Sequence, residues 1–267
     1  MSILLIPFLA CALLAAIHGY FGLHVLKRGV IFLDIALAQL ASLGALVGSI
    51  AGLAMGSPQG YAVSAAFTLV GAIIFTLSRT TYSREIPQEA IIGIVYVVAA
   101  AASIAALSRF PSAGHQLQEM MIGNILFVWP PDLVKTAILY AVVGAIHLIF
   151  YRQFWAVSTE TSPPRQALWW DFAFYATFGL IVTSSVKLAG VLLVFMLLVA
   201  PATAALLLSR HRLTQLGIAW GFGTVCSGIG LLTAVRWDFP PGAAIIVTCG
   251  IGLLGVWTAS RIRIRPR

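Results

Sequence analysis

One carboxylate lies inside a stretch of the chain that is otherwise long and apolar enough to cross a lipid bilayer. Asp34 belongs to the run GVIFLDIALAQLASLGALVGSIAGLAMG, residues 29–56. A charge in hydrocarbon is costly, so an intramembrane acid normally faces the protein interior or a water-filled path. Two interpretations stay open: Asp34 contacts a cation in a transport path, or it pairs with Arg28 near the headgroups.

Other groups that bind metals are sparse along the chain. Gln39 follows Asp34 in the same run, and His18 is the histidine placed deepest in its apolar run. A single histidine in apolar surroundings is more often a packing residue than a ligand, and this applies also to His24 and His147. Three isolated cysteines predict small buried apolar residues and no metal or disulfide framework: Cys11, Cys226 and Cys249.

Sequence motifs for hydrolytic chemistry are absent from the chain. It contains no GxxxxGK[ST] phosphate loop, no HExxH pair and no GxSxG elbow. His115 and Glu119 are four residues apart and share a helix face, but two ligands make a weak cation site, and a solvated face is the favoured interpretation. We therefore expect no enzymatic activity in this chain, and any ATP hydrolysis must come from elsewhere.

The elements that hold these residues follow from composition. The chain has 267 residues, of which 60% are hydrophobic and 9% charged, and several uninterrupted apolar runs reach bilayer length. This predicts an all-α polytopic membrane protein in which residues 1–267 form one transmembrane domain. No short cleavable signal precedes the first run. The net charge of +8 fits basic cytoplasmic loops and attraction to anionic lipid better than it fits nucleic acid binding.

Apolar runs between polar breaks predict the membrane spans. They lie near 3–24, 30–55, 60–78, 90–108, 133–151, 168–186, 188–208, 214–235 and 241–260. The total is nine, or eight if the runs on either side of Lys187 form one full helix and one shorter element. With the N-terminus outside, twelve Lys and Arg residues fall in inner segments and four in outer ones, which places the basic tail 261–267 in the cytoplasm.

Several local features refine this scheme. Gly44, Gly48, Gly52 and Gly56 recur every four residues and predict a helix face that a neighbour approaches closely. Glu89 suits the N-terminus of the fourth span.

Prolines at two places in the chain predict breaks in the helices. The segment 112–132 is amphipathic and predicts a helix at the outer surface, closed by Pro130-Pro131. Pro201 predicts a kink or an end, which leaves 202–212 as a short basic cytoplasmic helix and turn.

Five segments together resemble the permease subunits of bacterial ABC-3 importers for zinc, manganese or iron. They are KRGVIFLDIALAQLASLG (27–44), EAIIGIVYV (89–97), MMIGNILFV (120–128), PPGAAIIV (240–247) and, most specific of all, VKLAGVLLVFMLLVAPATAALLL (186–208). The resemblance covers nearly the whole chain. It implies the permease fold of the vitamin B12 importers, a homodimer with the path between two copies, and a location in the bacterial inner membrane.

The resemblance also implies partners and residue roles. An ABC ATPase subunit binds the inner face, and an extracytoplasmic metal-binding protein delivers the metal, which is cargo and not a resident cofactor. Asp34 matches the family's metal-contacting aspartate, whereas Gln39 stands five residues later, where the family has a histidine four residues later. Expected along the path are Asp34, Gln39 and His18, with Lys187 as an outer gate, and expected at the ATPase are Pro201, Ala202, Thr203, Arg210 and Arg212.

Three other functions stay open at this point. A permease for a metal chelate or another small solute would use the same architecture. A polytopic membrane enzyme would need acids or histidines clustered at one membrane face, and the eight acids are spread thinly. A standalone channel or carrier would show internal repeats of broken helices, and none is convincing.

Overall fold

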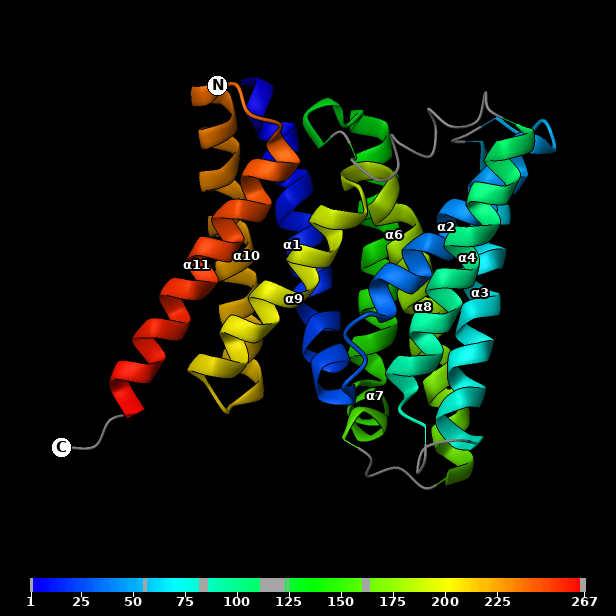
Figure 1. The fold of residues 1–267 in the computed structure, drawn as a ribbon. Coiled ribbons are helices and arrows are strands. Elements are labelled where there is room, and N and C mark those ends of the chain that lie inside the picture. The colour runs from blue at the N-terminus through cyan, green and yellow to red at the C-terminus, as the bar shows by residue number, and fades with distance from the viewer. Residues whose placement is uncertain are drawn as a thin grey trace. The chain divides into compact units, whose positions relative to one another are not determined.

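The computed structural model is built from helices throughout the residues that it describes, which are 2–54, 57–81, 86–110, 123, 125–159 and 164–264. Within these residues no strand occurs. The helices in chain order are α1 Ser2–Arg28, α2 Leu33–Ile50, α3 Pro58–Thr81, α4 Gln88–Arg109, η2 Ile125–Phe127, α6 Pro130–Ile149, α7 Tyr151–Ser158, α8 Pro164–Ala189, α9 Val191–Leu208, α10 Arg212–Trp237 and α11 Pro241–Ile264 (Figure 1).

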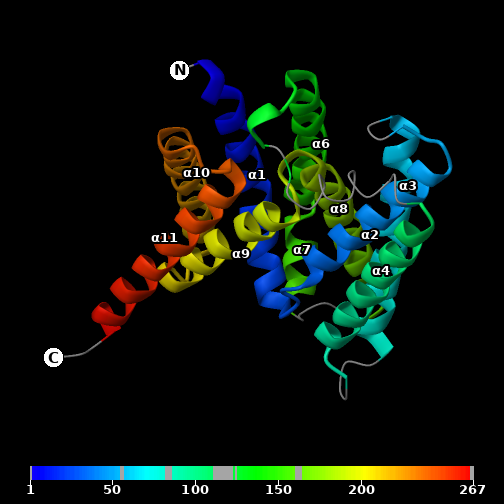
Figure 2. The ribbon, with the colours of Figure 1, turned by 45° about the horizontal axis from the view of Figure 1, so that its top comes forward.

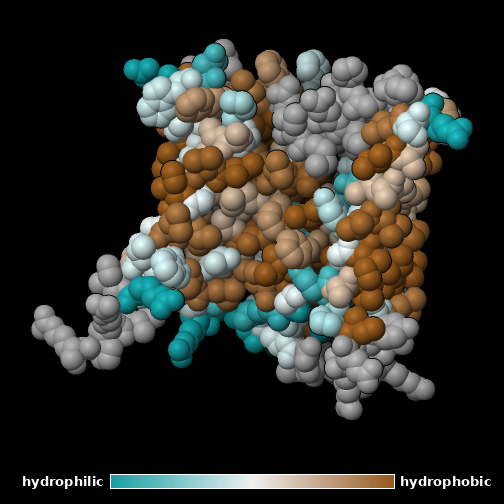
Figure 3. Space-filling view, in the orientation of Figure 1, coloured by the Kyte–Doolittle hydropathy of each residue, from teal (hydrophilic) through white to brown (hydrophobic). Residues whose placement is uncertain are grey.

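Nine of the described helices are long and apolar enough to cross a membrane, which confirms the higher of the two predicted numbers. The two runs beside Lys187 are separate full-length helices, α8 and α9, and only Gly190 lies between them. Gly190 has a φ of 79°, a left-handed conformation that glycine adopts without strain. In the view of Figure 3, apolar side chains cover the flanks of the helices, and hydrophilic ones gather toward helix ends.

The residues divide into two compact units, each assembled from separate segments of the chain. Unit 1 contains Met1–Leu26, Ile122–Tyr140 and Leu188–Arg267, and unit 2 contains Lys27–Met121 and Ala141–Lys187. Consequently α1 and α6 each contribute to both units.

Unit 1 packs α9, α10 and α11 against one another through small residues (Figure 1). A Cβ on Gly230 of α10 would lie 2.5 Å from the Cα of Ile245 in α11. On α1, a Cβ at Gly22 would overlap the Leu198 carbonyl of α9. Backbones therefore approach closely at these glycines, as is typical of helices that associate within a bilayer.

Unit 2 packs α2 against α3 and α4, which lie side by side in both ribbon views (Figures 1 and 2). Gly44 meets α3, where a Cβ would lie 2.8 Å from the Cα of Ser64. The predicted four-glycine face is wrong at Gly52, because α2 ends at Ile50, and Gly56 lies outside the described residues. Gly52 has a φ of 82°, and the amides of Gly52 and Leu53 bond back to the carbonyls of Ser49 and Gly48, the pattern of a Schellman helix end.

Of the two outcomes predicted for Pro201, a kink or an end of the helix, the end does not occur. α9 continues through Pro201 to Leu208, so 202–208 belong to the span, and the break falls at Ser209–His211 instead. A proline removes only one helical hydrogen bond, and Pro201 is buried among packed neighbours that keep the apolar helix in place. The segment that remains between the helices is shorter than predicted.

Buried hydroxyl groups in unit 2 are satisfied mainly within their own helices. Each of the following donates to the carbonyl four residues earlier, at 2.6 to 2.9 Å: Ser42, Thr76, Ser103, Thr183 and Ser185. This back-bonding allows polar side chains to be buried where no water is present.

Candidate functional site

Asp34 occupies the first turn of α2 and is completely buried. Neither of its carboxylate oxygens has a hydrogen-bond partner within the described part of the chain. The predicted alternative partner, Arg28, bonds to Asp171 instead, at 2.8 Å. A buried carboxylate without a partner is costly, and such groups in membrane helices mark paths for ions or protons. Asp34 is therefore the strongest candidate ligand in this structure.

Gln39 lies on a different side of α2. Its amide nitrogen donates to the Ser103 hydroxyl of α4 at 3.3 Å, and the side chain is buried. α2 is a continuous α-helix from Leu33 to Ile50, so residues five apart point about 140° away from each other. The structure thus places Gln39 at the contact between α2 and α4 and does not direct it to the same side as Asp34.

His18 belongs to unit 1, whereas Asp34 and Gln39 belong to unit 2. The His18 side chain is completely buried, its Nδ1 lies 3.0 Å from the Leu14 carbonyl, and its ring lies edge-on to Tyr140. Its Nε2 has no hydrogen-bond partner among the described residues. His18 remains a buried imidazole with one nitrogen available to a ligand.

His147 and His24 contribute to packing. His147 stacks on Phe154 with ring centroids 3.8 Å apart, and its Nε2 lies 2.9 Å from the Thr177 hydroxyl. His24 packs on Tyr20, with centroids 4.7 Å apart. His115 and Glu119, like the predicted surface helix up to residue 122, lie outside the described residues. Among the residues that are described, no group of three His, Cys, Asp or Glu side chains is placed to hold a metal.

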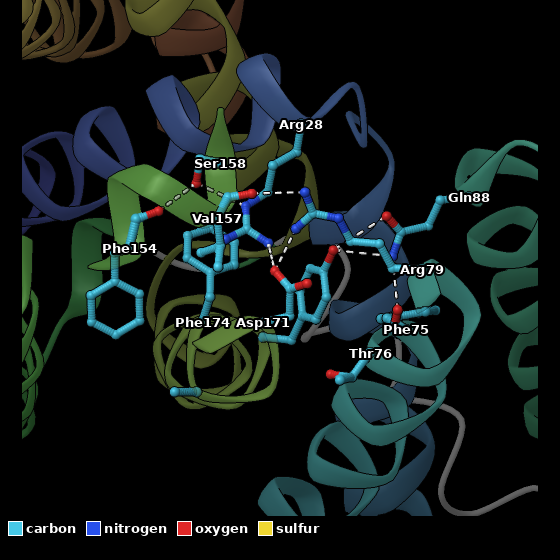
Figure 4. A network of polar contacts seen from close by, with 12 residues as sticks. Arg28, Phe75, Thr76, Arg79, Gln88, Phe154, Val157, Ser158, Asp171 and Phe174 are labelled. Atoms are coloured by element: carbon cyan, nitrogen blue, oxygen red, sulfur yellow. Dashed lines mark hydrogen bonds and ion pairs between the residues drawn. The ribbon is translucent and has the colours of Figure 1, made fainter. Parts of the chain in front are cut away.

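Unit 2 contains a buried charge network that was not predicted from the sequence (Figure 4). Arg28 at the end of α1 and Arg79 near the end of α3 both donate to Oδ1 of Asp171 in α8. The Arg28 and Asp171 side chains are 1% and 2% exposed, which makes this pair a desolvated one. The sequence contained one indication of this network. The first and third predicted spans end at the membrane face where the sixth begins, so Arg28, Arg79 and Asp171 are expected at the same face.

Additional contacts surround this network. Arg28 donates to the Ser158 hydroxyl at 3.0 Å and lies over the Phe174 ring, 3.9 Å from its centroid. Arg79 also donates to the Val157 carbonyl at 2.7 Å. Gln88, at the start of α4, donates to the Phe75 carbonyl at 2.8 Å (Figure 4). The network joins the ends of α1, α3, α7 and α8.

Glu89 lies in the first turn of α4 as predicted, but its carboxylate serves another helix. Oε1 accepts a hydrogen bond from the backbone amide of Phe32 at 3.0 Å. Phe32 is the N-cap residue of α2, and its apolar side chain provides no cap of its own. A carboxylate from α4 therefore caps the helix that carries Asp34.

The residues predicted for the gate and for ATPase docking fall into two groups. Lys187 lies exposed in the last turn of α8. Pro201 and Ala202 are buried inside α9, and Thr203 is half-buried. Arg210 lies exposed between α9 and α10, and Arg212 is the first residue of α10. Of the five residues predicted for ATPase docking, only Arg210 and Arg212 are exposed.

The apolar helices define a multi-pass membrane protein. A model of the ABC 3 transport family matches residues 1–259, and the chain belongs to this family. It is similar to the manganese transport system membrane protein MntC of Halalkalibacterium halodurans, with 23% identity over 250 residues that cover 89% of this chain and 80% of the relative. A probable iron transport system membrane protein of Haemophilus influenzae is 25% identical over 199 residues, covering 72% and 73% of the two chains.

A solved structure shares the fold. The match is to PsaBC from Streptococcus pneumoniae in complex with Fab, with a TM-score of 0.78 and 20% sequence identity, over 96% of this chain and 91% of that chain. The predicted all-helical permease fold is thereby confirmed.

Proposed function

We propose that the chain is the membrane permease subunit of an ATP-driven importer and forms the path for a divalent metal ion. The observation that carries this proposal is Asp34, a fully buried carboxylate whose two oxygens have no partner among the described residues. Membership of a transport family supports it. A passing cation would make a transient contact with this carboxylate and would leave readily, as conduction requires.

The cargo that the ligands favour is manganese or iron. Carboxylate, carbonyl and water oxygens suit Mn²⁺, whereas zinc sites are built from imidazole and thiolate groups. Gln39 is held by Ser103, and no cluster of metal-binding side chains occurs within the described ranges. Relatives named for manganese and for iron transport point the same way. We therefore rank zinc below these two metals.

The proposal includes partners and an orientation. Because the chain lacks a phosphate-binding loop motif, a separate ABC ATPase subunit supplies the energy, and it docks at Arg210 and Arg212. An extracytoplasmic metal-binding protein delivers the ion, Lys187 contributes to an outer gate, and two copies of the chain form the path. The N-terminus lies outside and the basic C-terminal tail lies in the cytoplasm, as the distribution of Lys and Arg favours.

The test is metal uptake in cells that lack this gene and are complemented with variants. Asp34→Asn keeps the shape of the side chain and removes its charge, so we expect uptake to fall by about 10-fold or more at equal protein in the membrane. The readout is manganese, iron and zinc content measured together under chelation.

The matched control is Asp132→Asn, which alters an acid whose ion pair with Lys135 is exposed and weak. It should leave uptake unchanged. Wild-type uptake by the Asp34→Asn variant would contradict the assigned role of Asp34. If none of the three metals responds to the gene itself, the cargo is a chelate or another small solute.

A further inference from the structure

The short link between α1 and α2 is held at both ends by carboxylates from other helices. At its start, Arg28 bonds to Asp171 of α8 at 2.8 Å. At its end, the Phe32 amide bonds to Glu89 of α4 at 3.0 Å. Between them Gly29 has a φ of 68°, which turns the chain sharply. Four residues of backbone are thus fixed at two points.

This arrangement bears directly on Asp34, which lies two residues after Phe32 in the first turn of α2. The direction of a side chain in the first turn depends on how that turn is closed and anchored. A serine or aspartate at position 32 would cap α2 locally. The chain instead has an apolar cap residue and takes its acceptor from α4, 57 residues away. The start of α2 is therefore tied to α4 and not only to itself.

We propose that Glu89 is a positioning residue for Asp34: by accepting the Phe32 amide it holds the first turn of α2 so that the Asp34 carboxylate faces the transported ion. This inference rests on the proposed function of Asp34. Outer groups that orient a ligand in this manner typically change affinity or activity by about 10- to 100-fold when removed. The role requires a hydrogen-bond acceptor at position 89, and it does not require a charge there.

The acceptor requirement gives a sharp test with two substitutions. Glu89→Ala removes the acceptor, and we expect metal uptake to fall about 10-fold at equal protein in the membrane. Glu89→Gln keeps an oxygen that can accept the Phe32 amide, and we expect uptake within about twofold of wild type. Asp132→Ala is the control, since Asp132 is likewise an acid in the first turn of its helix and has only an exposed partner.

Two outcomes would overturn the proposal. Wild-type uptake by Glu89→Ala would show that the cap does not matter. Equal loss in Glu89→Gln and Glu89→Ala would show that the charge acts by itself, as for a residue that binds the ion. Asp34→Asn, tested in parallel, separates the two hypotheses. If Asp34→Asn transports metal normally, the proposed function of Asp34 is wrong. If Asp34→Asn is inactive and Glu89→Ala transports normally, only the positioning role of Glu89 is wrong.

A second readout does not depend on transport. In a chain whose three cysteines, all buried, are replaced by alanine, Asp34→Cys provides a unique thiol for a small charged reagent in membranes. Adding Glu89→Ala should change the labelling rate about fivefold or more, and adding Glu89→Gln should not, because protection depends on side-chain direction. An unchanged rate, including an absence of labelling in all three chains, would overturn the proposal.

Discussion

At the scale of single residues, the buried charges of unit 2 divide into a paired set and an unpaired one. Asp171 is shared by two arginines, and Asp34 has no partner within the described chain. A buried ion pair with several hydrogen bonds fixes the positions of the helices that carry it, whereas a buried carboxylate without a partner raises the free energy of the folded protein. The first group suits a structural role and the second suits a functional one.

Asp171 therefore offers a prediction about stability. Asp171→Asn would leave Arg28, whose side chain is 1% exposed, and Arg79 without a counter-charge. Breaking a buried pair by removing one partner costs about 3–5 kcal/mol, so we expect a clear decrease in the unfolding midpoint in detergent. Asp132→Asn is the control, since an exposed pair contributes less than about 1 kcal/mol. Equal midpoints for the two variants would show that the network does not stabilise the fold.

The burial of Asp34 could be predicted from the sequence, whereas the pairing of Asp171 could not, for a physical reason. Asp34 is conspicuous because its neighbours in the sequence are apolar, and this property can be read locally. The partners of Asp171 are 92 and 143 residues away, so its pairing depends on how helices are arranged in space. Glu89 is similar: its place at a helix start is visible in the sequence, whereas its bond to Phe32 is not.

At the scale of elements, spans were predictable because the bilayer fixes their length and composition. All nine predicted runs correspond to described helices, although ends differ by several residues. The errors in the predicted helix boundaries occur at prolines and glycines, which can either interrupt a helix or be accommodated in it. One of the two outcomes expected at Pro201 was the end of the helix, yet α9 continues through it. Gly52 was expected to extend α2, yet it follows the end of that helix. The short helix α7 lies almost entirely between the predicted spans 133–151 and 168–186, where no span was predicted.

Packing between α2 and α3 provides a prediction at this scale. Gly44→Ala would place a Cβ 2.8 Å from the Cα of Ser64, so the helices must separate, and overpacking of this kind costs about 1–3 kcal/mol. Gly93→Ala is the matched control in the interior of α4, where no atom lies within 4 Å of the added carbon. There alanine should stabilise the helix by up to about 1 kcal/mol. The measurement is the thermal unfolding midpoint of each variant. A shift of both midpoints in the same direction would contradict the close approach of α2 and α3 at Gly44.

At the scale of the whole molecule, the proposed topology, in which each of the nine long apolar helices among the described residues spans the membrane once, puts the two ends of the chain on opposite sides. The connection between α9 and α10 then lies on the side of the C-terminal tail. Arg210 and Arg212 are exposed at this connection, and Gln215 closes it by donating to the Ser209 carbonyl at 2.8 Å. A basic, compact and exposed turn is suited to an acidic surface on a cytoplasmic partner.

Replacing both arginines by alanine should weaken association with the ATPase subunit by about 10-fold, and the effect should diminish as salt screens the charges. The measurement is co-purification of the ATPase in detergent over a range of salt concentrations. Arg109 and Arg236 lie in the last turns of α4 and α10, which the proposed topology puts at the opposite membrane face, so alanine at these two exposed positions is the control. Undiminished co-purification of the ATPase with the Arg210 and Arg212 variant would count against this docking site.

The hydroxyl groups that bond within their own helices bear on how unit 2 can move. A hydrogen bond between two helices breaks when one slides past the other, and in hydrocarbon the separated groups find no water to replace it. Ser42 and Thr76 bond to carbonyls of their own helices, so each moves together with its acceptor. Ser103 and Thr183 do so as well, but they also bond to Gln39 of α2 and Thr68 of α3. Relative movement of these helices would therefore break the contacts of Ser103 and Thr183 with their neighbours and leave the bonds within each helix intact.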